Sequence, residues 1–208
     1  VNMAGNCICD DEACREASKQ EIIRRYFDAL NALAKGSTSE KEAQKIELLM
    51  NMAGITVTDR KVVIKALERA KETDGPAAAL ELRDGRIITG KTTNLLGASA
   101  ALLLNVLKVL AGIDHETHII SPESIEPIQK LKVDYLKSKN PRLHTDEVLI
   151  ALSASAATNP QARLALSQLP ELAGCQAHTS VMLSDVDIKI FKKLEVQLTS
   201  EAVYERSE

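Results

Sequence analysis

Aromatic residues are scarce in this chain. Tryptophan is absent, and aromatic side chains make up only 2% of the 208 residues. Sites for single-stranded nucleic acid stack bases on aromatic rings along a basic groove. The net charge is −3 and the sequence contains no run of basic residues, so the positive surface that such a groove needs is missing as well. Both features argue against a nucleic acid as partner.

Long hydrophobic runs are missing too. The longest apolar stretch, residues 97–111, is interrupted by Asn105 and Lys108. It falls short of the roughly 20 apolar residues that a membrane-spanning helix needs. The sequence shows no signal peptide. We therefore expect no membrane partner and a cytoplasmic location.

The chain opens with VNMAGNCICDD, which begins with Val1 and does not resemble a natural start. We therefore expect this sequence to be a piece of a longer protein, whose missing part could supply half of any site. Three of its four cysteines, Cys7, Cys9 and Cys14, follow a C-x-C-x4-C spacing that matches no zinc motif. We expect reduced thiols, as in cytosolic proteins, and no metal site.

Residues 10–72 predict helices without a strand. In the first helix, apolar residues recur at intervals of three and four, and Gly36 ends it. A Ser39-x-x-Glu42 capping box opens the second helix, and Thr58 or Asp59 caps the third. We expect residues 1–73 to be a helical segment, the tail of an upstream helical domain.

From residue 74 onward the pattern changes to strands that alternate with helices. The predicted strands are residues 77–82, 86–90, 117–121, 175–183 and 196–200. The first two are separated by Arg83-Asp84-Gly85, a typical hairpin turn. Residues 74–208 therefore predict an α/β domain, and its opening hairpin makes the sheet mixed.

Residues 85–92, GRIITGKT, match the phosphate-loop pattern GxxxxGK[ST] at every position. A phosphate loop wraps an anion in backbone N–H groups and leads directly into a helix. Here the intervening residues are Arg-Ile-Ile-Thr, and β-branched side chains favour an extended backbone. Gly85 fits the turn of a hairpin, Gly90 ends the returning strand, and a helix capped near Asn94 begins too late. We favour the hairpin over the phosphate loop.

The stretch PAAALELRDGRIITGKTTNLLGASAALLLNVLKVL resembles the opening of the cytidine-deaminase fold, with its strand, D-G-R-I turn, strand and central helix. The resemblance implies a three-layer fold with a mixed sheet. Zinc deaminases carry [HC]-A-E on the central helix and P-C-x-x-C at the next helix start. The matching positions read GASAA (residues 97–101) and SPESIEP (residues 121–127), without zinc ligands. The fold could therefore be shared, but zinc-dependent deamination is not expected.

Over its whole length the chain resembles the C-terminal part of an uncharacterised bacterial family, "domain of unknown function eighteen forty-six". The resembling stretches include REASKQEIIRRYFDAL, IISPESIEPIQKLK and NPRLHTDEVLIALSASAATNP. The resemblance implies a bacterial, cytoplasmic protein with a further N-terminal domain ahead of this chain. It implies no reaction.

Polar residues gather at two places where α/β proteins bind ligands, at strand ends and helix starts. The first group, Lys91, Thr92, Thr93 and Asn94, joins a strand to a helix and could hold a phosphate or carboxylate. The alternative, which we favour, is that residues 92–94 cap the helix.

The second group lies in residues 140–147, NPRLHTDE. Arg142 could bind an anion, and His144 could act as a catalytic acid or base oriented by Asp146 or Glu147. The structural alternative, which we favour, is that Thr145 caps the next helix and that the acidic residues complement its dipole. His115 and His118 flank Glu116 without a third metal ligand at helical spacing.

Three functions remain open, and the sequence does not decide whether the chain is an enzyme or which cofactor it would use. The leading one is a binding and assembly domain that recognises a small anionic or nucleotide-like ligand. The second is an enzyme that hydrolyses ATP or transfers phosphoryl groups with Lys91 and Thr92. The third is a structural module that assembles into a homo-oligomer, for which the apolar central helix and the helical arm would provide the contact.

Overall fold

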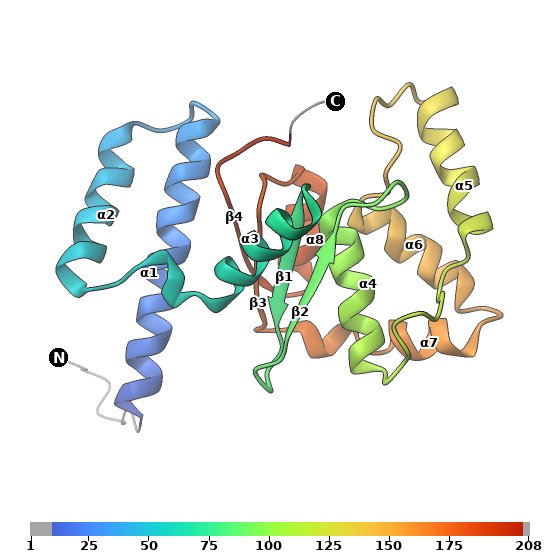
Figure 1. Ribbon diagram of the computed structural model, residues 1–208, viewed down its shortest axis with the longest axis horizontal. Coiled ribbons are helices and arrows are strands. Elements are labelled where there is room, and N and C mark those ends of the chain that lie inside the picture. The colour runs from blue at the N-terminus through green and yellow to red at the C-terminus, as the bar shows by residue number, and fades with distance from the viewer. Residues whose placement is uncertain (1–9, 206–208) are drawn as a thin grey trace. The chain divides into compact units, whose positions relative to one another are not determined.

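The computed structural model describes residues 10–205, which divide between Arg60 and Lys61 into two compact units (Figure 1). The first unit holds α1 (Asp11–Ala34), α2 (Glu40–Ala53) and a 3-10 turn, Val57–Asp59. The elements of the second unit are α3 (Lys61–Thr73), β1 (Ala77–Glu81), β2 (Ile87–Lys91), α4 (Ala98–Leu110), α5 (Pro122–Lys130), a π-helical turn (Leu131–Tyr135), α6 (Thr145–Ser155), α7 (Pro160–Leu166), a 3-10 turn (Leu169–Leu172), β3 (Gln176–Thr179), α8 (Asp185–Lys193) and β4 (Gln197–Ser200).

The first unit is a pair of helices that pack against each other. Asp10 caps α1 by accepting a hydrogen bond from the backbone N–H of Ala13 at 2.9 Å, and Gly36 follows the helix with φ of +69°. The start of α2 differs from the prediction, because the Ser39 side chain makes no capping hydrogen bond. The hydroxyl of Thr38 binds Glu42 instead, at 2.7 Å.

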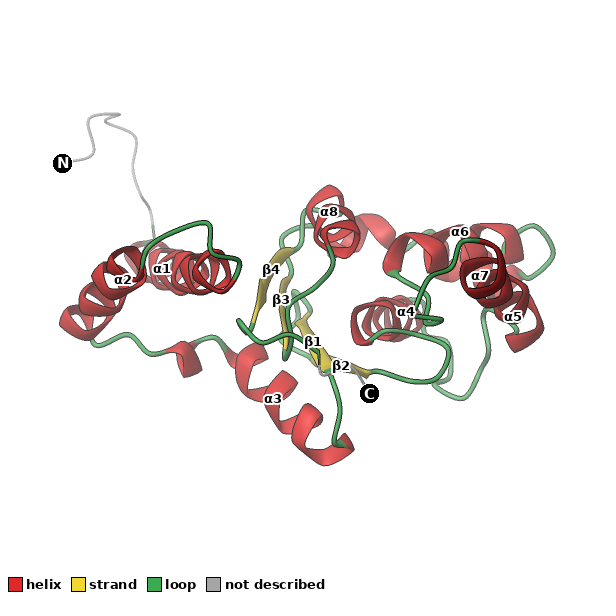
Figure 2. Cartoon of the chain, turned by 90° about the horizontal axis from the view of Figure 1, so that it is seen from above, coloured by secondary structure: helices red, strands yellow, loops and turns green. Residues whose placement is uncertain are grey.

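The second unit is built on a mixed four-stranded sheet with the order β2-β1-β3-β4. β1 pairs antiparallel with both β2 and β3, and β3 pairs parallel with β4. The predicted α/β class and mixed sheet are therefore confirmed. Figure 2 shows α3 on one side of this sheet and α8 on the other.

Alternation along β1 decides which helix covers which face of the sheet. Ala79 packs with Val62 and Ala66 of α3. Its neighbours Ala78 and Leu80 belong to the large core cluster that includes α4 and Phe191 of α8. Because α3 covers one face of the sheet, the structure groups residues 61–73 with the α/β unit, whereas the sequence grouped them with the helices before it.

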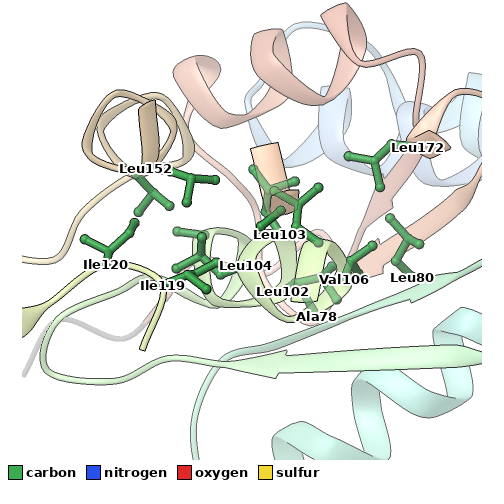
Figure 3. Close-up of a cluster of buried hydrophobic side chains, with 14 of the residues drawn as sticks. Ala78, Leu80, Leu102, Leu103, Leu104, Val106, Ile119, Ile120, Leu152 and Leu172 are labelled. Carbon is green, nitrogen blue, oxygen red and sulfur yellow. The ribbon is translucent and has the colours of Figure 1, made fainter. Parts of the chain in front are cut away.

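The strand predicted at residues 117–121 is wrong. These residues adopt no strand, and the described residues form four strands where the sequence predicted five. Ile119 and Ile120 are buried in the main core, and Figure 3 shows them near Leu104 and Leu152. The apolar run therefore signals burial and not strand pairing. The more specific expectation of a cytidine-deaminase-like fold is not confirmed.

Candidate functional site

The segment that matches the phosphate-loop pattern is a hairpin, as the turn chemistry predicted. β1 and β2 pair antiparallel, with Ala78 opposite Gly90 and Glu81 opposite Ile87. Gly85 has φ of +83°, a left-handed conformation that glycine adopts without strain. The carboxylate of Asp84 accepts a hydrogen bond from the backbone N–H of Arg86 at 3.0 Å and stabilises the turn. Residues 87–91 are a strand, so their backbone does not wrap an anion.

Gly90, the second glycine of the pattern, has a role that the sequence did not reveal. It lies inside β2 and does not end it. A Cβ atom at this position would lie 2.2 Å from the backbone nitrogen of Leu102 in α4. The glycine is required because the central helix crosses the strand at backbone distance.

The segment after β2 does not cap α4. That helix begins at Ala98 with Gly97 as its N-cap, so the predicted capping by residues 92–94 is wrong. The Thr93 hydroxyl instead accepts hydrogen bonds from the backbone N–H groups of Leu95 and Leu96, at 3.2 and 3.0 Å. Lys91, Thr93 and Asn94 are exposed, and Thr92 is half-buried. Lys91 is the last residue of β2, and residues 92–94 form a short surface loop.

This loop meets the second predicted segment through the backbone. Leu96 and Leu143 form a parallel bridge. The N–H of Leu143 donates to Leu95 at 2.9 Å, and the N–H of Gly97 donates to Leu143 at 3.2 Å. The structure thus brings together the two polar segments that the sequence singled out, residues 91–94 and 140–147.

Arg142 lies directly before this bridge, and about a third of its side chain is exposed. Its guanidinium forms an ion pair with Glu205 at 2.6 Å. Its backbone N–H donates to the side-chain oxygen of Asn140 at 3.0 Å, which stabilises the turn. Arg142 is therefore already paired with a carboxylate of the same chain.

His144 lies directly after the bridge and is the N-cap residue of α6. Its Nδ1 atom lies 3.1 Å from Oδ2 of Asp187, at the start of α8. The predicted orienting partners were Asp146 and Glu147. Asp146 accepts the N–H of Glu147 at 2.8 Å, and Glu147 accepts the backbone N–H of His144, also at 2.8 Å. These carboxylates stabilise the helix start, and the ring is oriented by Asp187.

Asp187 is buried and accepts four hydrogen bonds. Its Oδ1 receives the backbone N–H and the hydroxyl of Thr145, at 2.9 and 2.8 Å. Its Oδ2 receives the hydroxyl of Ser184 at 2.7 Å and faces the His144 ring. Burial acts to raise the pKa of Asp187, but the hydrogen bonds outweigh burial and lower that pKa from 3.8 to about 2. The carboxylate is ionised at neutral pH.

The protonation of His144 follows from this neighbour. An ionised carboxylate can only accept, so Nδ1 of His144 carries the hydrogen. The hydrogen bond with Asp187 raises the pKa of His144 above its ordinary value of 6.5, against the opposing effect of partial burial. The side chain remains about one-third exposed.

A second charge pair supports the same helix start. Lys132, in the π-helical turn, is buried. Its ammonium group donates to the carbonyl of Arg142 at 2.6 Å and pairs with Glu147 at 2.7 Å. Residues 142–147 are thus held by Lys132 from the π-helical turn and by Asp187 from α8.

Sequence reasoning missed both of these supports. Asp187 lies 43 residues from His144, and Lys132 lies 15 residues before Glu147. The available signal is local: serine is a typical N-cap residue, and the hydroxyl of Ser184 accepts the N–H of Asp187 at 3.2 Å at the start of α8. Nothing in that pattern tells which segment the carboxylate faces.

The remaining candidate residues for a metal site do not lie together in the part of the chain that the structure describes. Nδ1 of His115 lies 3.2 Å from Oε1 of Glu116, and both side chains are largely exposed. Within residues 10–205, no three histidine, cysteine or acidic side chains are placed to hold a metal ion. Cys14 is exposed, while Cys7 and Cys9 lie outside the described residues. Over the same residues, no helix is long and apolar enough to cross a membrane.

Comparison with known proteins assigns both parts of the chain to one family. Residues 58–208 match the family model described as domain of unknown function DUF1846, C-terminal, and residues 1–54 match its N-terminal model. UPF0371 proteins from Corynebacterium aurimucosum and Corynebacterium diphtheriae are 59% and 54% identical over 99% and 100% of this chain. A UPF0371 protein from Streptococcus thermophilus is 49% identical over 99% of it. The chain spans about two fifths of the length of these relatives, 41% to 42%.

Proposed function

The chain belongs to the DUF1846 family of bacterial proteins, and we propose that its α/β unit is a binding and assembly domain for a small anionic or nucleotide-like ligand. The ligand would bind where the loop after β2 meets the start of α6. Arg142 and His144 are the main recognition residues, and Lys91 and Thr92 lie nearby, at the end of β2 and the start of the loop that follows it. The observation that carries this proposal is the backbone bridge between Leu96 and Leu143.

The charges at this junction support an anion as ligand. Arg142 is partly exposed, and its planar guanidinium can hold two oxygens of a carboxylate or phosphate. His144 gains positive charge more readily than an ordinary histidine, because Asp187 raises its pKa. The nearby Lys132 is buried and paired with Glu147, so it stabilises the loop and does not serve as a ligand group.

The test is a thermal-shift panel of nucleotides and phosphorylated metabolites on the whole chain. A ligand at 100 times its dissociation constant adds about 2.7 kcal/mol to the free energy of unfolding, which raises the melting temperature by several degrees. We expect Arg142→Ala with His144→Gln to abolish that shift. Arg86→Ala is the matched control, because Arg86 is an exposed arginine of the same unit that pairs with Asp84 in the hairpin turn. No shift with any member of the panel would reject the proposal.

The assembly part of the proposal rests on exposed apolar side chains. Leu131, Tyr135 and Leu136 are 50%, 72% and 68% exposed, in and beside the π-helical turn. Apolar groups gathered on a surface are typical of protein contacts. We expect a homo-oligomer in light scattering, and a monomer over the micromolar range would contradict it. A cytoplasmic location and a contact with the N-terminal part of the longer relatives belong to the same proposal.

An enzyme is the second candidate, and the His144–Asp187 pair is the observation in its favour. A histidine fixed through Nδ1 by a buried carboxylate is the arrangement used for general acid–base catalysis. In that case His144 would be the catalytic residue, and the role predicted for Asp146 would pass to Asp187. Loss of turnover in His144→Gln, for any substrate found in the panel, would support it.

A further inference from the structure

The carboxylate of Asp187 needs a positive neighbour. Among its four hydrogen-bonding partners, the backbone N–H and hydroxyl of Thr145 and the hydroxyl of Ser184 are neutral. The fourth, the His144 ring, is the one that can carry positive charge. A buried charge is costly unless it is paired, so this environment favours a protonated ring.

The second ring nitrogen of His144 is the group left over. Nδ1 is engaged by Asp187, whereas Nε2 makes no hydrogen bond within residues 10–205. In the protonated ring, Nε2 carries a hydrogen and can only donate. The carboxylate of Asp187 therefore fixes the orientation of the ring and favours Nε2 as a hydrogen-bond donor.

We propose that Asp187 is a positioning residue that holds His144 as a charged donor for the phosphate group of a small ligand. This inference rests on the proposed function, since it names how the same site recognises its anion. It predicts that the ligand binds to the protonated ring, so that binding weakens as the pH rises through the pKa of His144.

The other charges around the ring agree with this direction. Asp187 on α8 and Glu147 on α6 favour the charged ring, and the ammonium of Lys132 opposes it. Lys132 is itself neutralised by Glu147 at 2.7 Å. Asp146 follows on the same helix and is engaged by a backbone N–H. Arg142, two residues before the ring, is paired with Glu205.

The experiment follows the four histidine Cε1–H signals of the whole chain by NMR between pH 5 and pH 9, with and without sulfate. Sulfate is the probe because it stays doubly charged over this range, whereas phosphate titrates. His144→Gln assigns the signal, and His115→Gln is the control, since that ring is 78% exposed and pairs with the adjacent Glu116.

We expect sulfate to raise the pKa of His144 and to leave the His115 signal where it is at each pH. Hydrogen bonds to charged groups contribute about 1.5–3 kcal/mol, so sulfate affinity should fall about tenfold or more between the protonated and the neutral ring. Asp187→Asn should lower the pKa of His144 and move the loss of affinity to lower pH. If that variant does not fold, Ser184→Ala retains the carboxylate but removes a neutral donor, and it should raise the pKa of His144.

Two results would overturn the inference. Sulfate that binds with the same affinity at pH 5.5 and pH 8.5 would show that the ring is not the donor, while anion binding itself, and with it the proposed function, would stand. A His144 signal that ignores sulfate at every pH, in a protein whose melting temperature still rises with a panel ligand, would place recognition elsewhere. A failure of the proposed function shows separately, as a panel without any shift.

Discussion

Two polar segments of the α/β unit contrast sharply. Residues 85–92 match a known nucleotide-binding pattern at every position, and residues 140–147 match none. In the structure, the first segment is explained by its own hairpin and by the close approach of α4 at Gly90. The second is held by two charged groups from other elements, Asp187 and Lys132. The pattern match thus reflects backbone geometry here, while the unmatched segment is where charged side chains from several elements contact one another.

The reason for the contrast is the range of the interactions. A turn such as Asp84-Gly85 is determined by neighbouring residues, so one stretch of sequence can match both a hairpin turn and the phosphate-loop pattern. Side chains at a site are supported by partners far along the chain. The following tests separate the two segments, in order of decreasing effect.

The largest effect is expected from Gly90→Ala. The added methyl group would overlap the backbone of Leu102, at 2.2 Å, so α4 must shift from the sheet. We expect a loss of about 3 kcal/mol in the free energy of unfolding, measured by urea denaturation. Gly85→Ala is the control, because its new methyl group would have no atom of the described residues within 4 Å, apart from its chain neighbours, so that the strain comes from the positive φ. It should cost about 1 kcal/mol; equal losses in both variants would contradict the close contact with α4.

Asp187→Asn comes next. Folding lowers the pKa of this carboxyl from 3.8 to about 2, which is equivalent to about 2 kcal/mol. This contribution to the free energy of unfolding is complete above the unfolded pKa and disappears as the pH falls toward 2. The variant should therefore be less stable at pH 7, and its stability should depend less on pH in the acidic range. Urea denaturation between pH 2 and pH 7 measures both effects.

Asp146→Asn is the matched comparison for that prediction, since Asp146 lies in the same cluster and accepts a backbone N–H. The amide oxygen can still accept this hydrogen bond, so its stability should change by less than about 0.5 kcal/mol. A larger loss of stability for Asp146→Asn than for Asp187→Asn would indicate that Asp146, as the sequence suggested, is the main partner of His144.

The stability due to His144 should have the opposite pH dependence. Its pKa is raised in the folded protein, so its contribution is complete below the ordinary value of 6.5 and is lost as the pH rises through the raised pKa. His144→Gln should therefore cost more stability at pH 5.5 than at pH 9. A difference of the opposite sign would show that the ring is neutral in the folded state.

Glu205→Gln should have a smaller effect than the preceding substitutions, and this effect is on sulfate binding. The carboxylate of Glu205 occupies Arg142, so an anionic ligand has to compete with it. Pairs as exposed as this one contribute up to about 1 kcal/mol, and the variant should bind sulfate up to about fivefold more tightly. Titration calorimetry at low ionic strength measures this, and weaker binding would mean that Glu205 assists the ligand.

The smallest effect on stability is expected from Lys91→Ala. This side chain is exposed at the end of β2, so the free energy of unfolding should stay within about 0.5 kcal/mol. If a turnover of ATP is found, it should survive in this variant. A turnover that requires Lys91 would instead restore the phosphate-loop interpretation.

Much of the local structure could be predicted from the sequence. The turn at Asp84-Gly85, the end of α1 at Gly36 and the cap of α8 at Ser184 all follow from neighbouring residues. The prediction of a strand at residues 117–121 was wrong, because residues such as Ile119 and Ile120 can be buried in a loop as well as in a strand. The need for Gly90 arises from a helix that crosses the strand, which no local pattern contains.

The candidate site was predicted only in part. Arg142 and His144 were chosen from the density of polar residues, and the structure places their segment beside residues 91–94. Asp187 could not be found, because a sequence separation of 43 residues leaves open which helix start it faces. The roles assigned to all of these residues in binding stay predictions.

The most direct test is the position of a bound anion. Crystals of the chain soaked in selenate, which scatters anomalously, locate the anion without assuming a ligand. We predict an anomalous peak within hydrogen-bonding distance of Nε2 of His144 or of the Arg142 guanidinium. A peak at the hairpin turn or beside Lys91 alone would contradict the account, because it would return recognition to the segment that matches the pattern.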